Sequence, residues 1–248
     1  AILKAGPESI GAMIAEPAMG SGGVILPPQG YWEEVQAVLR RHDILLIADE
    51  IITGFGRTGA WFACETYDIQ PDMMTMAKQL TASYFPMSAV GISVDLRNVI
   101  AGQAHDLGVL GHGFTYGGHP VGAAIALKTL EIYEGMGGPD HFISMGHRLA
   151  QHLAQVADLP GVGDVRCEGL LAGVEMRSDT RFADGLGRLV GDEAERRGVL
   201  FRIIGNTLAI APPYITTEDE MAMICGTLAQ SIETVLAHDW ALLSVRDR

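Results

Sequence analysis

The chain has 248 residues, of which 48% are hydrophobic and 19% are charged, and its formal net charge is −13. This length and composition predict a packed globular protein with one large domain or two modest ones. The acidic balance argues against a nucleic-acid backbone or an anionic membrane surface as the main partner. The sequence contains no apolar run long enough to cross a bilayer.

The three cysteines, Cys64, Cys167 and Cys225, lie far apart and form no C-x-x-C pair. This spacing predicts neither a disulfide framework nor a metal site. A reducing cytoplasm is therefore the expected location.

Short apolar runs alternate with a helical pattern in the first part of the chain. The opening residues AILKAGPES contain no initiator methionine, so the sequence is expected to begin within a domain. Tyr31–His42 is a predicted amphipathic helix, and the predicted strands are residues 10–15, 44–48, 73–77 and 89–94. This alternation predicts an α/β layer with a mostly parallel sheet.

A second pattern begins after a long predicted helix that runs from about Pro120 to Tyr133. Gly-Gly-Pro at 137–139 ends this helix. The later predicted elements are a helix at 141–157, strand-like residues 163–176, a helix at 183–197, strands at 199–204 and 207–211, and a helix from Thr217. They predict a smaller α+β domain, so the chain is divided into residues 1–138 and 139–248.

Two residues that can carry chemistry follow predicted strands. Asp49 comes directly after residues 44–48, at the strand end where open α/β sheets bind ligands. A helix or loop cap is the alternative role for this carboxylate. Lys78 follows residues 73–77, and partial desolvation there would make its amine a nucleophile for Schiff-base chemistry. The alternative is a lysine whose amine reaches solvent.

The segment Gly113–Pro120 (GFTYGGHP) precedes a predicted helix of small residues. Its backbone amides, the Thr115 hydroxyl and the helix start together can bind a phosphate. An ordinary glycine-rich turn is the alternative.

A second glycine-rich run, GFGRTG at 54–59, matches the dinucleotide pattern G-x-G-x-x-G. Asp49 and Glu50 precede it, however, and would repel a pyrophosphate. Pro71 follows too soon for the long helix that a dinucleotide site requires. These glycines are therefore predicted to shape a tight loop.

These spacings together resemble the class III pyridoxal-phosphate aminotransferases, which have fold type I. The resemblance is carried by LLIADEIITGFGRTGAWFACETYDIQPDMMTMAKQLTAS and by the flanks AMIAEPAMGSGGVILPPQGYWEEV and HGFTYGGHPVGAAIALKTLEIYE. It implies that residues 1–138 are the C-terminal part of a large cofactor-binding domain with helices on both faces of its sheet. Residues 139–248 would be the small C-terminal domain. Family members are longer at the N-terminus, where further cofactor contacts lie.

The resemblance also implies roles for individual residues. Lys78 would form the internal aldimine with pyridoxal 5'-phosphate and later move the proton between cofactor and substrate. Asp49 would pair with the pyridinium nitrogen, which lets the ring accept electrons. Ile51 would pack on the ring face. Thr115, next to Phe114, would bind the cofactor phosphate of the neighbouring subunit, which implies a homodimer with shared active sites.

Two positions bear on the substrate. Ser21 stands where glutamate- and ornithine-type members often have a glutamate. The run LFRIIGNTLAIAPPY resembles the amine–pyruvate (omega) transaminases, in which an arginine matching Arg202 binds a substrate carboxylate. A surface arginine on a strand is the alternative for Arg202.

The expected activity is ping-pong transamination from an amine or omega-amino acid to a keto acid such as pyruvate. The alternatives are 4-aminobutyrate or ornithine-type transamination, an aminomutase, a catalytically incomplete fragment, and a nicotinamide-dependent dehydrogenase. The expected partners are small molecules and a second copy of the chain, without nucleic acid or membrane.

Overall fold

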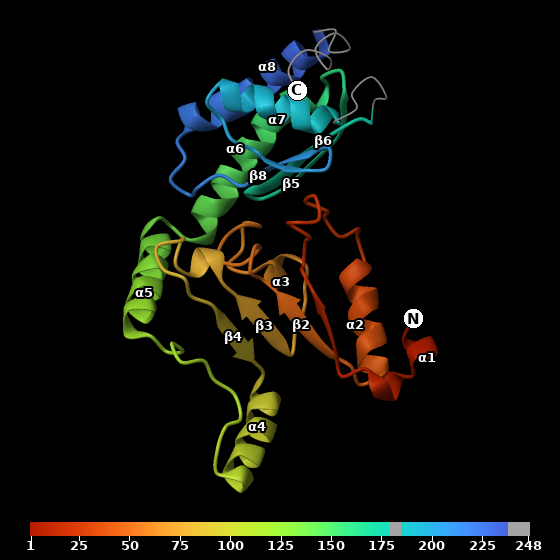
Figure 1. Cartoon of the computed structure of the whole chain (residues 1–248), viewed down its shortest axis with the longest axis vertical. Helices are drawn as coiled ribbons and strands as arrows, with labels where there is room; N and C mark the ends of the chain where they lie inside the picture. The colour runs from red at the N-terminus through yellow and green to blue at the C-terminus, as the bar shows by residue number, and fades with distance from the viewer. Residues whose placement is uncertain (179–184, 238–248) are drawn as a thin grey trace, which may run out of the picture. The chain divides into compact units, whose positions relative to one another are not determined.

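The computed structural model describes residues 1–178 and 185–237, which fall into two compact units (Figure 1). The first unit comprises Ala1–Pro17, Pro27–Phe55 and Ala60–Gly138. The second comprises Ala18–Leu26, Gly56–Gly59 and the chain from Pro139 onward. Two short early segments thus belong with the later part of the chain. Among the helices in the described ranges, none has the length and hydropathy needed to span a membrane.

The first unit is built on a four-stranded sheet in the order β1-β2-β3-β4. Strands β1, β2 and β3 pair in parallel, and β4 runs antiparallel to β3. The strands are β1 (Ala12–Ala15), β2 (Leu45–Asp49), β3 (Met73–Met76) and β4 (Ala89–Ile92). This arrangement confirms the predicted mostly parallel sheet.

Helix α2 (Tyr31–Arg41) packs on this sheet through one buried face. Trp32, Gln36 and Leu39 are its buried residues, at the i, i+4, i+7 spacing of an amphipathic helix. Trp32 and Leu39 share a core cluster with Leu46 and Ala48 of β2. Burial of large apolar side chains such as these stabilises the fold by about 1.5–3 kcal/mol each.

The remaining helices of the first unit are α1 (Ile2–Ala5), α3 (Ala63–Thr66), α4 (Val94–Leu107) and α5 (Pro120–Gly135). Helix α5 confirms the predicted helix from Pro120. Helix α4 was not predicted, and it has no buried residue. Ser93 caps its start by accepting from the Leu96 amide at 3.3 Å, and Gly108 ends it with a φ of 72°.

The second unit contains an antiparallel sheet in the order β5-β6-β8-β7, together with helices. The predicted strand-like residues 163–176 form two strands because Gly169, with a φ of 56°, turns the chain between them. The predicted helix 183–197 forms α7, which begins at Leu186; the first two predicted residues, 183 and 184, lie outside the described ranges. The elements are α6 (Pro139–Ala157), β5 (Val162–Glu168), β6 (Leu171–Met176), α7 (Leu186–Arg196), β7 (Arg202–Ile204), β8 (Thr207–Ile210) and α8 (Glu218–Ala237).

Arg166 of β5 holds the segment Ala18–Leu26 within the second unit. Its Nε and Nη2 donate to the carbonyls of Val24 and Gly23, each at 2.8 Å. Its Nη1 contacts the carboxylates of Asp164 and Glu175, both at 2.6 Å. Val24 is fully buried with a φ of 54°, a strained conformation for a β-branched residue. The hydrogen bonds of Arg166 therefore fix a segment that carries backbone strain.

Arg57 anchors the segment Gly56–Gly59 in the same unit. Its side chain is buried, its Nη1 donates to the Pro212 carbonyl at 2.6 Å, and its guanidinium lies 4.8 Å from the centre of the Tyr214 ring. A Cβ on Gly169 would lie only 2.5 Å from the carbonyl carbon of Thr58. The close approach of these backbones requires glycine at position 169.

Candidate functional site

Asp49 is the last residue of β2, and its half-buried carboxylate is held by two hydrogen bonds. Thr75 Oγ1 donates to Oδ1 at 3.0 Å, and the Ile51 amide donates to the same oxygen at 3.1 Å. Thr75 lies beside Asp49 in the register of β2 and β3. The carboxylate is thus oriented through Oδ1, which leaves Oδ2 to meet an external donor.

Lys78 follows β3 and begins a single 3₁₀ turn, Lys78–Leu80. It is exposed, and its φ of 41° lies in the left-handed region that non-glycine residues seldom adopt. Strained backbone of this kind clusters at functional sites. Because β2 and β3 are parallel neighbours, Asp49 and Lys78 leave the sheet at the same carboxyl edge. The structure therefore brings these two predicted residues together at one edge.

Glu50, next to Asp49, is fully buried and supports the chain that follows β2. Its Oε1 accepts from the Cys64 amide at 2.7 Å, and its Oε2 accepts from the Ala63 amide at 3.1 Å and from Thr53 Oγ1 at 2.5 Å. Burial, followed by the nearby Glu50 charge, raises the pKa of the Cys64 thiol. Sequence reasoning did not find this role, because the acceptor and its donors are up to 14 residues apart.

The other predicted cofactor residues lie in different surroundings. Ile51 is half-buried and donates its amide to Asp49. Phe114 and Thr115 lie on an exposed segment before α5, where the Gly117 amide donates to the Phe114 carbonyl at 2.9 Å. The packing of Ile51 on a ring and the binding of phosphate by Thr115 stay predictions.

The two predicted substrate positions belong to the second unit. Ser21 is an exposed residue of the segment that Arg166 holds. Arg202 is the exposed first residue of β7, the edge strand of its sheet, and it pairs with Ala209 of β8. Exposure at an edge leaves the guanidinium accessible, and carboxylate binding by Arg202 stays a prediction.

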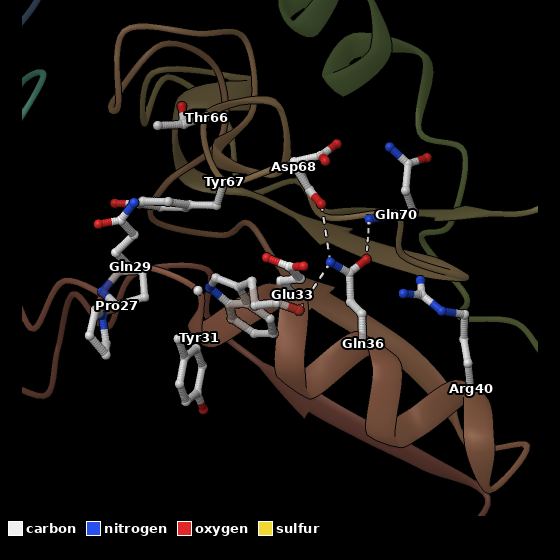
Figure 2. Close-up of a pocket in the computed structure, with 13 residues that line it drawn as sticks. Pro27, Gln29, Tyr31, Glu33, Gln36, Arg40, Thr66, Tyr67, Asp68 and Gln70 are labelled. Carbon is white, nitrogen blue, oxygen red and sulfur yellow. Dashed lines mark hydrogen bonds between the residues drawn. The ribbon is translucent and has the colours of Figure 1, made fainter.

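A depression of about 750 Å³ lies in the first unit beside α2 (Figure 2). Its buried polar residue is Gln36, whose Nε2 donates to the carbonyls of Trp32 and Asp68, each at 3.1 Å. The Gln36 Oε1 accepts from the Gln70 amide at 2.8 Å. Figure 2 shows that the bonds to Asp68 and Gln70 join α2 to the turn before β3, so this polar group has a structural role.

Comparison with known proteins decides the family. Residues 1–232 match the family model described as aminotransferase class-III. The chain belongs to this family. The chain has fold type I, as expected for this family. Enzymes of the family depend on pyridoxal phosphate. The dinucleotide alternative fails because helix α3, after the GFGRTG loop, has only four residues.

Relatives of this class III chain include plant transaminases. A probable gamma-aminobutyrate transaminase 3, mitochondrial, of Oryza sativa subsp. indica is 43% identical, over 94% of this chain and 47% of that protein. The gamma aminobutyrate transaminase 3, chloroplastic, of Solanum lycopersicum is 44% identical, over 89% of this chain and 44% of that protein. The chain therefore spans about half the length of the curated relatives it matches. Because these names include organelles, the cytoplasmic location stays a prediction.

Among solved structures, the omega transaminase from Pseudomonas jessenii in complex with PMP is 44% identical to this chain. The match has a TM-score of 0.91 and covers 94% of this chain and 53% of that one. The similarity therefore extends over both units of the class III chain.

Proposed function

We propose that this chain supplies the Lys78–Asp49 part of a pyridoxal-phosphate site in a class III aminotransferase. The observation that carries the proposal is the pairing of β2 with β3, which places a nucleophile and an oriented carboxylate at one sheet edge. An amine and an acceptor for a pyridinium proton are the groups that this cofactor requires. The residues present therefore fit the cofactor.

In this proposal each residue has a defined task. Bound pyridoxal phosphate supplies an electron sink for the substrate carbanion. The Lys78 Nζ attaches the cofactor and carries the proton during transfer. Asp49 accepts a hydrogen bond from the pyridine nitrogen and favours its protonated form. Ile51 contacts the ring, and Phe114 and Thr115 contribute to binding the phosphate in a homodimer with shared sites.

The proposed reaction moves an amino group from an amine or omega-amino acid to a keto acid such as pyruvate. Serine in place of glutamate at Ser21, and the position of Arg202 at a strand edge, support the amine–pyruvate type. The second candidate is transamination of 4-aminobutyrate, which the names of the plant relatives favour. The two candidates differ in the donor and share the reaction class.

We further propose that residues 1–138 and 139–248 correspond to the C-terminal part of the large domain and to the small domain, with the segments Ala18–Leu26 and Gly56–Gly59 of the first range grouped with the second unit. The similarity to about half of each longer relative supports this assignment. The remaining cofactor contacts would then come from chain outside these residues. The isolated 248 residues would then hold an incomplete cofactor site.

Borohydride reduction after incubation with pyridoxal phosphate, followed by peptide mass spectrometry, tests the proposal. The assay is sharp because the chain contains three lysines: Lys4, Lys78 and Lys128. We expect a stoichiometric pyridoxyl adduct on Lys78 that disappears when an amine donor is added before reduction. Lys78→Ala should abolish this adduct, and Lys128→Ala should leave it unchanged.

The outcomes separate the alternatives. An adduct in the complete polypeptide, but not in the isolated 248 residues, would identify an incomplete site in this part. Equal labelling of all three lysines, or no adduct in the complete polypeptide, would contradict the proposal. Comparison of an arylalkylamine with 4-aminobutyrate as donor, each with pyruvate as acceptor, would decide between the two reaction types.

A further inference from the structure

We infer that Thr75 is a positioning residue whose hydroxyl fixes the Asp49 carboxylate and thereby sets the protonation of the cofactor's pyridine nitrogen. The inference rests on the proposed function. It concerns a residue that lies on the strand leading to Lys78 and that has no role in the proposed chemistry itself.

Thr75 is joined to the end of β2 in two ways. Its Oγ1 donates to Asp49 Oδ1 at 3.0 Å, and its carbonyl accepts from the Glu50 amide at 3.0 Å. The main-chain bond fixes the register, so the side chain of Thr75 lies beside that of Asp49. A β-branched residue is also stiff about χ1, which holds the hydroxyl in one direction.

The orientation of Asp49 depends on this hydroxyl. The second donor to Oδ1, the Ile51 amide at 3.1 Å, belongs to the main chain and persists when side chains change. With one donor alone, the carboxylate can turn about χ2, which is a soft torsion in aspartate. Two donors on one oxygen hold the plane of the carboxylate and direct Oδ2 away from the strand pair.

The hydroxyl also affects charge. A hydrogen bond donated to a carboxylate favours its ionised form. In the proposed site, a carboxylate that accepts this bond would be the weaker base, so a proton shared with the pyridine nitrogen would stay on the nitrogen. Without the hydroxyl, the proton would shift toward the carboxylate, and the nitrogen would become more neutral. Loss of orientation and loss of charge stabilisation therefore act in the same direction.

Two readouts in the complete polypeptide test the inference: the Kd for pyridoxal phosphate and the ¹⁵N chemical shift of cofactor labelled at the pyridine nitrogen. We expect Thr75→Val, which keeps the shape and removes the donor, to weaken binding about tenfold. Its ¹⁵N shift should move toward that of a neutral pyridine. Thr75→Ser keeps a donor and should retain wild-type values of both.

Thr129→Val is the matched control, because Thr129 is another threonine of the first unit with a hydrogen-bonded hydroxyl, which donates to the Ile125 carbonyl at 2.9 Å. It should leave the Kd and the ¹⁵N shift unchanged. If Thr75→Val does not fold, Thr75→Cys replaces it, since a thiol is a weak donor. The Kd and the ¹⁵N shift of Thr75→Cys are then compared with those of Thr75→Ser, which keeps the stronger donor.

A purely structural role of Thr75 would lower the melting temperature without moving the ¹⁵N shift, and that result would overturn the inference. A Kd and ¹⁵N shift equal to wild type in the donor-free variant would overturn it as well. Failure of the proposed function has a different signature: wild-type protein would bind no cofactor and give no adduct on Lys78. The inference would then fall with it, before any Thr75 variant is compared.

Discussion

Glu50→Gln should destabilise the first unit strongly, although it only replaces one carboxylate oxygen by an NH₂ group. The carboxylate accepts from two amides and one hydroxyl, and it is fully buried. In glutamine, Oε1 can still accept from the Cys64 amide, but the new NH₂ group faces the Ala63 amide, which then lacks an acceptor. A buried amide without a partner costs about 1–3 kcal/mol. Loss of the charge weakens the remaining bond by about 1 kcal/mol, so we expect a total loss of about 2–4 kcal/mol.

Urea unfolding followed by tryptophan fluorescence measures this loss, because Trp32 and Trp61 belong to the first unit. We expect a lower midpoint with an unchanged slope. Glu65→Gln is the control: Glu65 lies in α3, the helix whose amides donate to Glu50, but it is exposed, and it accepts from the Phe62 amide at 3.0 Å. Its substitution should cost less than about 1 kcal/mol. An equal cost for the two variants would refute the reasoning that Glu50 is an essential buried acceptor.

Three further predictions concern the second unit. Gly169→Ala should destabilise it by at least about 3 kcal/mol in thermal unfolding, because the new Cβ meets backbone at 2.5 Å. Gly205→Ala has a similar φ of 59° and open space around the Cβ, so it should cost only about 1 kcal/mol. Arg166→Ala should leave two carbonyls without donors and speed proteolysis within residues 18–26, whereas Arg188→Ala, at an exposed ion pair, should not. Burial raises the pKa of Cys167 to about 11, so its alkylation at pH 8 should be about a hundredfold slower in folded than in unfolded protein. The same shift stabilises the folded state below the unfolded thiol pKa, and this contribution should be lost as the pH rises toward 11.

The strands of the first sheet were predictable because each is a short apolar run followed by polar or turn residues. The central strand β2 shows why: it alternates half-buried and buried residues, so nearly every position must be apolar. Helix α4 was missed for the opposite reason. It buries none of its residues, although Leu96, Val99 and Ile100 recur at helical spacing. The caps Ser93 and Gly108 marked its ends.

Asp49 and Lys78 were predictable as candidates because each follows a strand, and strand ends have a sequence signal. Thr75 was not, because its importance comes from lying beside Asp49 in the sheet register. Periodicity predicts that two runs are strands and does not predict which residues they place side by side. The same holds for Glu50, whose donors come from a helix of four residues that is too short to be recognised by its pattern.

The two early segments of the second unit, Ala18–Leu26 and Gly56–Gly59, show a stronger limit on what can be predicted from the sequence. Arg57 and Arg166 hold them there by donating to main-chain carbonyls 155 and 142 residues away, at Pro212 and Val24. Every residue has a carbonyl, so such an acceptor leaves no signal in the sequence. In a chain with a net charge of −13, an arginine is first expected to pair with one of the many carboxylates. Arg166 does so with Asp164 and Glu175, but this expectation does not predict its carbonyl acceptors. The geometry of arginine, with several donors in one plane, suits a buried carbonyl equally well, and only the fold shows which acceptor it meets.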